Sequence, residues 1–278
     1  MREVIASERP TTLEHGAATV EPPDPDRVER GEFVVRSAET GAPLFVQARL
    51  DADLRPLRIG LPKVKYEGLT SEGRMSGLRY AHRTFGYRTR QPLRRRESCS
   101  ACNTAVDYPE VHRCIESITT DIEGLFADFH PAEYERQRAL VADVILPEWR
   151  MGGGLWTSGI INQTSALTYH RDRNNLATTW SAMLVMRRHL RGGYLHVPAL
   201  DLYASCDDGH VLIFEGASLL HGVTGFHIRP GGYRYSLVYY ALTGMKACLP
   251  LRDEVAWGAR NRTERETAQA DALEAPDA

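Results

Sequence analysis

Five short apolar runs follow one another in residues 156–242: SGIINQ (158–163), WSAMLVM (180–186), YLHVPAL (194–200), HVLIF (210–214) and YRYSLVYYAL (233–242). Turn signals such as RGG (191–193) and DG (208–209) separate them, as they separate the strands of antiparallel sheets. Several short strands at this spacing are typical of a sandwich or a barrel. We therefore predict a mainly β protein with flanking helices, of the α+β class, whose core is a jelly roll.

Two helices are predicted before this β-rich half. From Asp107 onward, apolar residues recur at spacings of three and four: Val111, Cys114, Ile115, Ile118, Ile122 and Leu125. That period predicts an amphipathic helix, with Asp107 as its cap and Pro109 in its first turn. A second amphipathic stretch follows Pro131 and runs to about Ile145. Further upstream, two alternating runs flank the turn ETGAP (39–43) and predict a β-hairpin over residues 32–50.

The two ends of the chain differ from its middle. Residues 1–30 are rich in proline and acidic residues and lack periodicity, so we predict a disordered N-terminal arm there. Residues 259–278 are polar and rich in alanine, and we predict a flexible tail. Residues 31–258 between them are predicted to form a single domain.

The composition is ordinary for a globular protein: the 278 residues are 25% charged and 42% hydrophobic, with a net charge of −2. These values exclude the collagen-like, fully disordered and disulfide-scaffold classes. No apolar run reaches the roughly 20 residues that a membrane helix needs, and the N-terminus MREVIASERP has no apolar signal core. We therefore expect a cytoplasmic protein with no membrane partner.

One ordered set of residues points to chemistry: His170, Asp172, His221, Arg234 and Ser236. In a strand, residues i and i+2 point to the same face, so His170 and Asp172 can address one point in space. Two imidazoles and one carboxylate form the facial triad of non-haem Fe(II) oxygenases. An arginine with a nearby hydroxyl suits the distal carboxylate of 2-oxoglutarate. The alternatives are a chance His-x-Asp pair and an ordinary salt bridge at Arg234, but the order of the set favours a metal site.

From residue 73 to residue 242 the chain resembles the Fe(II)- and 2-oxoglutarate-dependent oxygenases. Within them it is similar to the TET/JBP branch, which oxidises methyl groups on nucleic-acid bases. The resemblance rests on SGIINQTSALTYHRDRNN (158–175), GGYLHVPAL (192–200), LLHGV (219–223) and YRYSLVYY (233–240). It implies one oxygenase domain over residues 31–258, with a double-stranded β-helix, or jelly-roll, core at about 155–245. It also implies a compact bacterial or phage form, in the cytoplasm of the bacterium or of the infected host cell.

The resemblance implies three groups of site residues. The first binds Fe(II), where O2 reacts: His170, Asp172 and His221. The second holds 2-oxoglutarate: Arg234, Ser236, His196 and Asn162. The third contacts a flipped base, by a hydrogen bond and by stacking respectively: Asn175 and Tyr240.

The chain departs from the family at one base-reading position. The family usually has a second base-reading histidine two residues after the stacking aromatic, whereas this chain has Leu242. A site that lacks one side chain for hydrogen bonding to the base can lose discrimination between bases or recognise a different edge of the base. The resemblance therefore implies oxidation of 5-methylcytosine to 5-hydroxymethylcytosine, with further oxidation left open and thymine as the alternative base. Two further hypotheses are hydroxylation of a small molecule or a protein side chain, and a non-catalytic jelly-roll binding module.

An arginine-rich stretch lies upstream of the helices. Residues 74–96 hold eight arginines and no acidic residue, interleaved with three aromatic residues. Such a stretch is typical of phosphate contacts with stacking platforms, although a solvated arginine-rich loop is the simpler alternative. Beside a base-oxidising site we favour DNA contact by Arg74, Ser76, Arg79 and Arg83. The partner is double-stranded DNA with a flipped base, or single-stranded DNA, and we expect the protein to be a monomer.

The cysteines allow one further metal site. Five cysteines are too few for a disulfide framework, and their odd number leaves at least one free thiol. Four residues could form a Cys3His zinc site: Cys99, Cys102, His112 and Cys114. Cys114, however, lies on the apolar stripe of the predicted helix, where cysteine serves as a small buried hydrophobe. We favour that structural interpretation over zinc.

Overall fold

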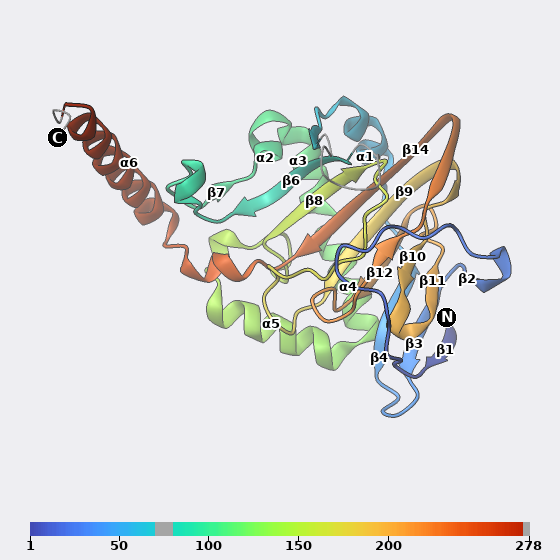
Figure 1. Ribbon diagram of the computed structural model, residues 1–278. Coiled ribbons are helices and arrows are strands. Elements are labelled where there is room, and N and C mark those ends of the chain that lie inside the picture. Colours follow the sequence, from blue (N-terminus) through green and yellow to red (C-terminus); the bar gives the residue numbers. More distant parts are fainter. Residues whose placement is uncertain (70–79, 275–278) are drawn as a thin grey trace.

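A computed structural model describes residues 1–69 and 80–274. Figure 1 shows two β-sheets facing each other, with helices on the outer side of the larger one. The larger sheet holds, in spatial order, β1 (Arg2–Ala6), β3 (Phe33–Ser37), β4 (Pro43–Arg49), β12 (His210–Phe214), β9 (Ser181–Gly192), β14 (Phe226–Tyr240), β8 (Ser158–Gln163), β6 (Tyr80–Arg88) and β5 (Glu67–Leu69), with β7 (Ser100–Ala101) beside β6. The smaller sheet holds β13 (Gly222–Val223), β10 (Leu195–Val197), β11 (Leu202–Ala204) and β2 (Val28–Glu29).

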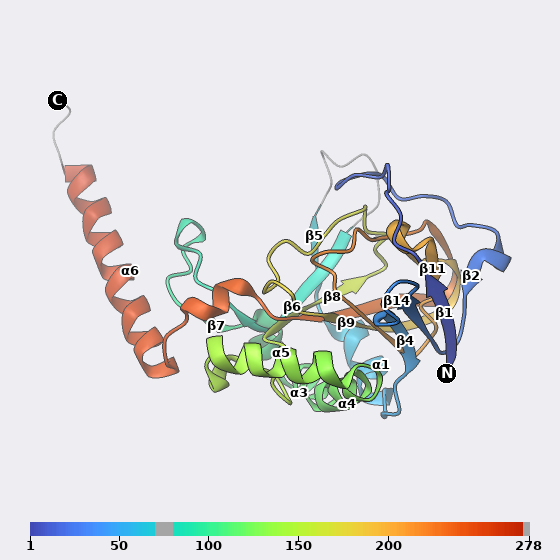
Figure 2. The same cartoon turned by 90° about the horizontal axis from the view of Figure 1, so that it is seen from below.

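Most of the helices lie on one side of the larger sheet, and the last helix extends away from it (Figure 1, Figure 2). The helices are α1 (Arg55–Gly60), α2 (Asn103–Asp107), α3 (Pro109–Ser117), α4 (Thr119–Phe129), α5 (Pro131–Val144) and α6 (Leu251–Glu274). Short 3-10 turns lie at Pro25–Arg27, Leu61–Lys63, Pro92–Arg94, Pro147–Trp149, Pro198–Leu200 and Thr243–Ala247. Figure 2 shows α3, α4 and α5 beneath the larger sheet, while α6 extends away from the body. Among the described residues, none of the helices combines the length and apolar character of a membrane span.

The two-residue period of β14 separates two cores. Leu237 and Tyr239 face the helices and belong to the core between the larger sheet and the helical layer. Ser236 and Val238 face the smaller sheet, because successive side chains of a strand point to opposite faces. Arg234 lies on that same inner face, two residues before Ser236. The alternation therefore directs a buried cation and a hydroxyl into the space between the sheets.

The first predicted helix is divided in the structure. The residues expected to form one helix belong to α3 and α4, which meet at Ile118. The predicted cap, Asp107, is the last residue of α2, and Tyr108 precedes α3 without a side-chain cap. Asp107 instead pairs with the buried guanidinium of Arg83. The cap prediction was wrong because this ion pair engages the carboxylate.

The two chain ends are more regular than their composition suggests. Within residues 1–30, β1 pairs with β3 in parallel and β2 pairs with β11. The arm between these strands is tied down as well, since Gly16 N donates to Tyr169 O at 2.6 Å and Gly225 N donates to Val20 O at 2.9 Å. The arm is ordered because its backbone groups find partners at the open edges of two sheets. Within the predicted flexible tail, residues 259–274 belong to the continuous helix α6, and residues 275–278 lie outside the described residues.

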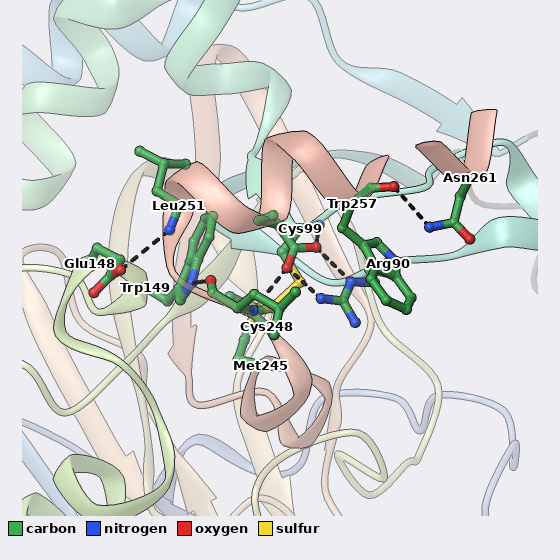
Figure 3. Close-up of polar contacts among 11 residues, drawn as sticks. Arg90, Cys99, Glu148, Trp149, Met245, Cys248, Leu251, Trp257 and Asn261 are labelled. Carbon is green, nitrogen blue, oxygen red and sulfur yellow. Dashed lines mark hydrogen bonds and ion pairs between the residues drawn. A yellow bond between two sulfur atoms is a disulfide. The ribbon is translucent and has the colours of Figure 1, made fainter. Parts of the chain in front are cut away.

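A disulfide anchors the start of α6. Cys99 and Cys248, 149 residues apart, are joined. The fully buried carboxylate of Glu254 in the first turn of α6 accepts hydrogen bonds from Arg90 Nε and Cys99 N, both at 2.6 Å (Figure 3). Trp257 lies on the other side of Arg90, whose guanidinium carbon is 5.1 Å from the ring centroid (Figure 3). Helix, disulfide and loop therefore form one packed unit.

The disulfide engages one of the four residues considered for a zinc site. Because its sulfur is bonded to Cys248, Cys99 is not available to a zinc ion. His112 Nε2 accepts a hydrogen bond from Gly86 N at 3.1 Å and is likewise engaged. The zinc site considered for these residues is thus not formed. The remaining three cysteines, Cys102, Cys114 and Cys206, are free thiols, which confirms that at least one stays unpaired.

Candidate active site

His170, Asp172 and His221 converge between the two sheets. Their ligand atoms all lie within 4.8 Å of one another. Asp172 Oδ1 is 3.7 Å from His170 Nε2 and 4.0 Å from His221 Nε2. Two backbone hydrogen bonds join the histidines: His170 N donates to His221 O, and His221 N donates to His170 O. The bridge between two distant segments therefore brings the three side chains together.

Both imidazoles are held in the same orientation. His170 Nδ1 is 2.8 Å from the carbonyl oxygen of Thr168, and His221 Nδ1 is 2.9 Å from that of Leu219. A carbonyl oxygen only accepts, so each Nδ1 carries the hydrogen and each Nε2 keeps a free lone pair. Such outer hydrogen bonds fix the tautomer and the ring direction of a metal-binding histidine. Both Nε2 atoms are thus prepared to bind a metal.

The carboxylate of Asp172 is positioned by two neighbours. Asn175 Nδ2 donates to Asp172 Oδ2 at 3.3 Å and to Ser181 Oγ at 2.9 Å. On the other side lies Gly216, where a Cβ atom would be 2.4 Å from Asp172 Oδ2. Asp172 N also donates to Gly216 O at 2.9 Å. The position of the Asp172 carboxylate therefore depends on a glycine that lies 44 residues away in the chain.

Burial keeps His221 neutral. Burial of its side chain and the nearby His170 together lower its pKa to about 4, against the opposing effect of Asp172. A histidine must be neutral to bind a metal, because the bonding nitrogen has to lose its proton. At neutral pH this imidazole is therefore ready to bind without an energetic cost for deprotonation.

A cavity of about 420 Å³ opens beside the triad. Its walls are largely apolar and come from both sheets: Ile160, Met183, Leu195, Phe214, Val223 and Val238. His15 from the N-terminal arm also lines it, and its Nδ1 accepts a hydrogen bond from Arg171 N at 3.4 Å. The sequence analysis missed His15, because no periodicity or motif in the arm indicates where it folds.

A buried cation lies behind the inner end of the cavity and is not among its lining residues. Asn162 and Ser236 line that end, and Asn162 Nδ2 donates to Ser236 Oγ at 3.4 Å. Beyond Ser236 lies Arg234, only 1% exposed, whose Nε and Nη2 are buried without a hydrogen-bond partner. Burial lowers the pKa of Arg234, and the nearby Arg187 lowers it further. A buried, unpaired guanidinium is costly, so this end of the cavity fits a carboxylate.

Known proteins share this architecture. No family model matches the chain. The bifunctional helicase and thymine dioxygenase JBP2 of Trypanosoma brucei brucei is 29% identical over 125 residues, which are 45% of this chain and 11% of that protein. The structure of NgTET1 in complex with 5mC DNA matches with a TM-score of 0.58 at 14% identity, over 80% of each chain. A 2OG-Fe(II) oxygenase family protein of Burkholderia pseudomallei matches with a TM-score of 0.47 at 14% identity, over 72% of this chain and 88% of that one.

The fold is similar to that of the NgTET1 structure. The jelly-roll core predicted for this chain is thereby confirmed. Since the chain spans only 11% of the trypanosome protein, that protein's full activity does not transfer with the likeness.

One residue expected at the co-substrate lies away from the cavity. Leu195 and Val197 point into the core between the sheets, so His196 points to the outer face of the smaller sheet. There it stacks on Tyr203 with the ring centroids 4.0 Å apart, and its Nδ1 is hydrogen-bonded to the Tyr169 hydroxyl. Burial lowers the pKa of His196 to about 4. In this structure His196 supports the strand before the metal site and does not line the cavity.

The residues expected at the base divide into two groups. Tyr240 and Leu242 line the cavity mouth, as does Asn175, although the Asn175 amide nitrogen is already bonded to Asp172. Arg83 lies away from the mouth, because its guanidinium is buried against Asp107 and Tyr108 on the helical side of the sheet. The expectation that Arg83 contacts DNA is not met. Arg74, Ser76 and Arg79 lie outside the described residues.

Proposed function

We propose that the protein is an Fe(II)- and 2-oxoglutarate-dependent dioxygenase that hydroxylates the methyl group of a DNA base, with 5-methylcytosine as the first substrate. The observation that carries the proposal is the triad of His170, Asp172 and His221, whose two free Nε2 atoms face one carboxylate. Three protein ligands on one side of a metal leave positions open for co-substrate and dioxygen.

The residues present fit both iron and 2-oxoglutarate. His170, Asp172 and His221 would hold the iron, and Gly216 leaves the space that Asp172 occupies. Arg234 would receive the distal carboxylate of 2-oxoglutarate, beside the Ser236 hydroxyl, because its Nε and Nη2 have no other partner. When bound, iron, 2-oxoglutarate and dioxygen together supply the oxidising power needed to hydroxylate a methyl C–H bond.

The chain's own residues position the base at the metal and exclude water from the site. The apolar side chains of Met183, Leu195 and Phe214 line the cavity beside the triad, so a substrate that fills the cavity displaces water from apolar walls. Tyr240 at the mouth offers a ring on which a base can stack, and Leu242 offers an apolar contact for the base or its methyl group. A base that enters between them presents its methyl group to the metal.

DNA is the substrate that the relatives favour. NgTET1 was solved with 5mC DNA, and the trypanosome relative is named a thymine dioxygenase. The triad lies inside a cavity between two sheets, out of reach of a base stacked within a duplex. The target base must therefore be flipped out of the helix or presented by a single strand.

Thymine is a second candidate base, and Leu242 is compatible with it. The side chain at this position lines the base entrance but can form no hydrogen bond, so it gives no polar discrimination between pyrimidines. Thymine and 5-methylcytosine carry their methyl group on the same ring carbon. The name of the trypanosome relative points in the same direction.

Nucleoside mass spectrometry tests the proposal. The protein is incubated aerobically with Fe(II), ascorbate and 2-oxoglutarate on three DNA samples: unmodified, 5-methylcytosine-containing, and thymine-rich without modified bases. We expect one added oxygen on 5-methylcytosine with the wild type and none with His170→Ala. The matched control is His227→Ala, which removes an exposed histidine that does not line the cavity and should keep activity.

Each of the remaining outcomes is informative. Oxidation of thymine alone would select the second candidate. Succinate formation without any change in DNA would refute the DNA substrate and favour a small molecule or a protein side chain. Loss of activity in His227→Ala as well would show that the assay reports folding and not the metal site. No succinate from folded protein that binds neither Fe(II) nor 2-oxoglutarate would favour a binding module.

A further inference from the structure

His15 lies in a tight turn of the N-terminal arm, at the metal cavity. Figure 1 shows the arm, in dark blue, crossing the smaller sheet. Ala17 N donates to Glu14 O at 3.0 Å and closes a four-residue turn. The third residue of this turn, Gly16, has a φ of +90°, a conformation that glycine adopts without strain. The second residue is His15, whose side chain is exposed and lines the metal cavity.

Backbone hydrogen bonds fix this turn beside the segment that carries the metal ligands. Gly16 N donates to Tyr169 O at 2.6 Å, and Tyr169 N donates to Ala17 O at 3.0 Å. Tyr169 is buried and directly precedes the metal ligand His170. Because these bonds use backbone atoms alone, a substitution of the His15 side chain leaves the turn attached to the site.

One ring nitrogen of His15 is engaged, and the other can donate a hydrogen bond. Its Nδ1 accepts a hydrogen bond from Arg171 N at 3.4 Å. A nitrogen that accepts carries no hydrogen, so the neutral ring has its hydrogen on Nε2. Within residues 1–69 and 80–274, no protein group accepts a hydrogen bond from this Nε2. The arm therefore brings to the cavity a donor that the protein itself leaves unused.

Most of the other polar side chains around the cavity already have partners. Asn162 Nδ2 donates to Ser236 Oγ at 3.4 Å, and Asn175 Nδ2 donates to two neighbouring side chains. Leu242 at the mouth forms no hydrogen bond through its side chain. A substrate ring that enters the cavity therefore meets the His15 donor among apolar walls and groups that are largely engaged.

We propose that His15 is a base-binding residue, whose Nε2–H donates a hydrogen bond to the ring of the target base. The inference rests on the proposed function, because it takes the occupant of the metal cavity to be a pyrimidine. Thymine carries acceptors at its carbonyl oxygens, and 5-methylcytosine carries one carbonyl oxygen and an acceptor ring nitrogen. Both candidate bases thus offer a group that this N–H can bind. The arm then provides the polar contact that Leu242 cannot give.

Two substitutions separate this role from a structural one. His15→Gln places an amide N–H at about the distance of Nε2 from the backbone, whereas His15→Asn keeps an acceptor at about the distance of Nδ1 and reaches no further. If His15 binds the base, His15→Gln keeps the contact and His15→Asn loses it. If His15 serves only to hold the backbone of Arg171, the order of the two variants is reversed.

Binding of single-stranded DNA measures the contact without oxidation. The full chain carries Mn(II) in place of iron, and two otherwise purine strands are compared by fluorescence anisotropy: one with a single 5-methylcytosine, the other with an abasic site there. We expect His15→Asn to weaken binding of the first strand about tenfold and of the second not at all. His15→Gln should stay close to the wild type on both strands. Thr12→Ala, at an exposed position of the same arm that does not line the cavity, is the matched control and should bind as the wild type does.

The outcomes separate this proposal from the proposed function. A preference for the 5-methylcytosine strand that is the same in wild type and His15→Asn would overturn the role of His15 and leave the DNA substrate standing. A loss in His15→Gln but not in His15→Asn would overturn it too, as would an equal loss on both strands. Equal binding of both strands by the wild type would refute the base as the occupant, and the role of His15 with it. Thermal unfolding of each variant shows whether it is folded.

Discussion

Arg234 is a residue whose position is costly until a ligand arrives. Replacing a buried charge by an apolar side chain of similar size is often neutral or stabilising by about 1–4 kcal/mol. We therefore expect Arg234→Met to unfold no earlier than the wild type in the absence of ligand. With Mn(II) as a stand-in for iron, 2-oxoglutarate at 100 times its Kd should stabilise the wild type by about 2.7 kcal/mol and the variant not at all. Thermal unfolding with and without 2-oxoglutarate measures both effects.

The exposed Arg229 gives the control for this experiment. Arg229→Met should keep the full shift with 2-oxoglutarate. A shift retained by Arg234→Met would mean that another group binds the carboxylate.

Gly216 controls the metal site through the space it leaves open. In Gly216→Ala the new Cβ would lie 2.4 Å from Asp172 Oδ2, so the carboxylate must move away from the two histidines. Displacing a group that orients a metal ligand typically costs about 10- to 100-fold in affinity. We expect that loss for Mn(II), measured by calorimetry. Gly124→Ala is the control, because a Cβ there meets nothing within 4 Å, and unchanged affinity in Gly216→Ala would refute the argument.

The ligand residues of the site could be predicted from the sequence, but the residues that position them could not. The His-x-Asp spacing predicts two ligands on one strand face, and an apolar run indicates His221. In the structure His170 and Asp172 lie after β8 and outside any strand, and an isolated bridge pairs His170 with His221. The contact of Gly216 with Asp172 depends on how two segments far apart in the chain meet. His15 enters the cavity only because its arm pairs with other segments.

At the scale of single elements, α4 carries a buried acid. Glu123 is 3% exposed and accepts a hydrogen bond from Leu155 N at 3.0 Å. Burial raises its pKa from 4.5 to about 7, against these backbone hydrogen bonds. Because the folded pKa lies above the unfolded one, this contribution to stability is complete below pH 4.5 and is lost as the pH rises through 7. The difference amounts to about 3 kcal/mol.

Glu123→Gln should remove this pH dependence. We expect the variant to be more stable than the wild type at pH 8 and no more stable at pH 4.5, as measured by denaturant unfolding at both values. Glu110→Gln, at an exposed position of α3, serves as the control and should follow the wild type. Parallel pH profiles of wild type and Glu123→Gln would show that Glu123 titrates normally.

Elements with a clear local period were predictable. The hairpin over residues 32–50 is confirmed by β3 and β4, which pair antiparallel. The N-terminal arm was not predictable, because β1 and β2 form by pairing with strands elsewhere and need no period of their own. The predicted cap was not predictable for the same kind of reason, since Asp107 is engaged by Arg83 of another element. The domain limits at residues 31, 258, 155 and 245 stay predictions.

At the scale of the whole molecule, the disulfide closes a covalent loop that spans more than half of the chain. Cys99 and Cys248 are 149 residues apart, and a cross-link over such a loop restricts the unfolded chain, typically by about 2–4 kcal/mol. The double variant Cys99→Ser with Cys248→Ser should lose stability by that amount in guanidinium unfolding. Cys114→Ser, at a free thiol, is the control. An unchanged midpoint in the double variant would show that the bond contributes nothing.

The disulfide and the proposed reaction need different redox conditions when the protein is prepared. The proposed reaction needs iron in its ferrous state, so the assay requires a reductant. The Cys99–Cys248 bond joins the loop that carries Arg96 to the segment after Leu242, and these are two walls of a second cavity, of about 540 Å³, that adjoins the metal cavity. A dithiol able to reduce this bond would part the walls while the metal ligands stay intact, whereas ascorbate does not take part in thiol–disulfide exchange. Two batches made with different reductants would then have the same active site and different entrances to it.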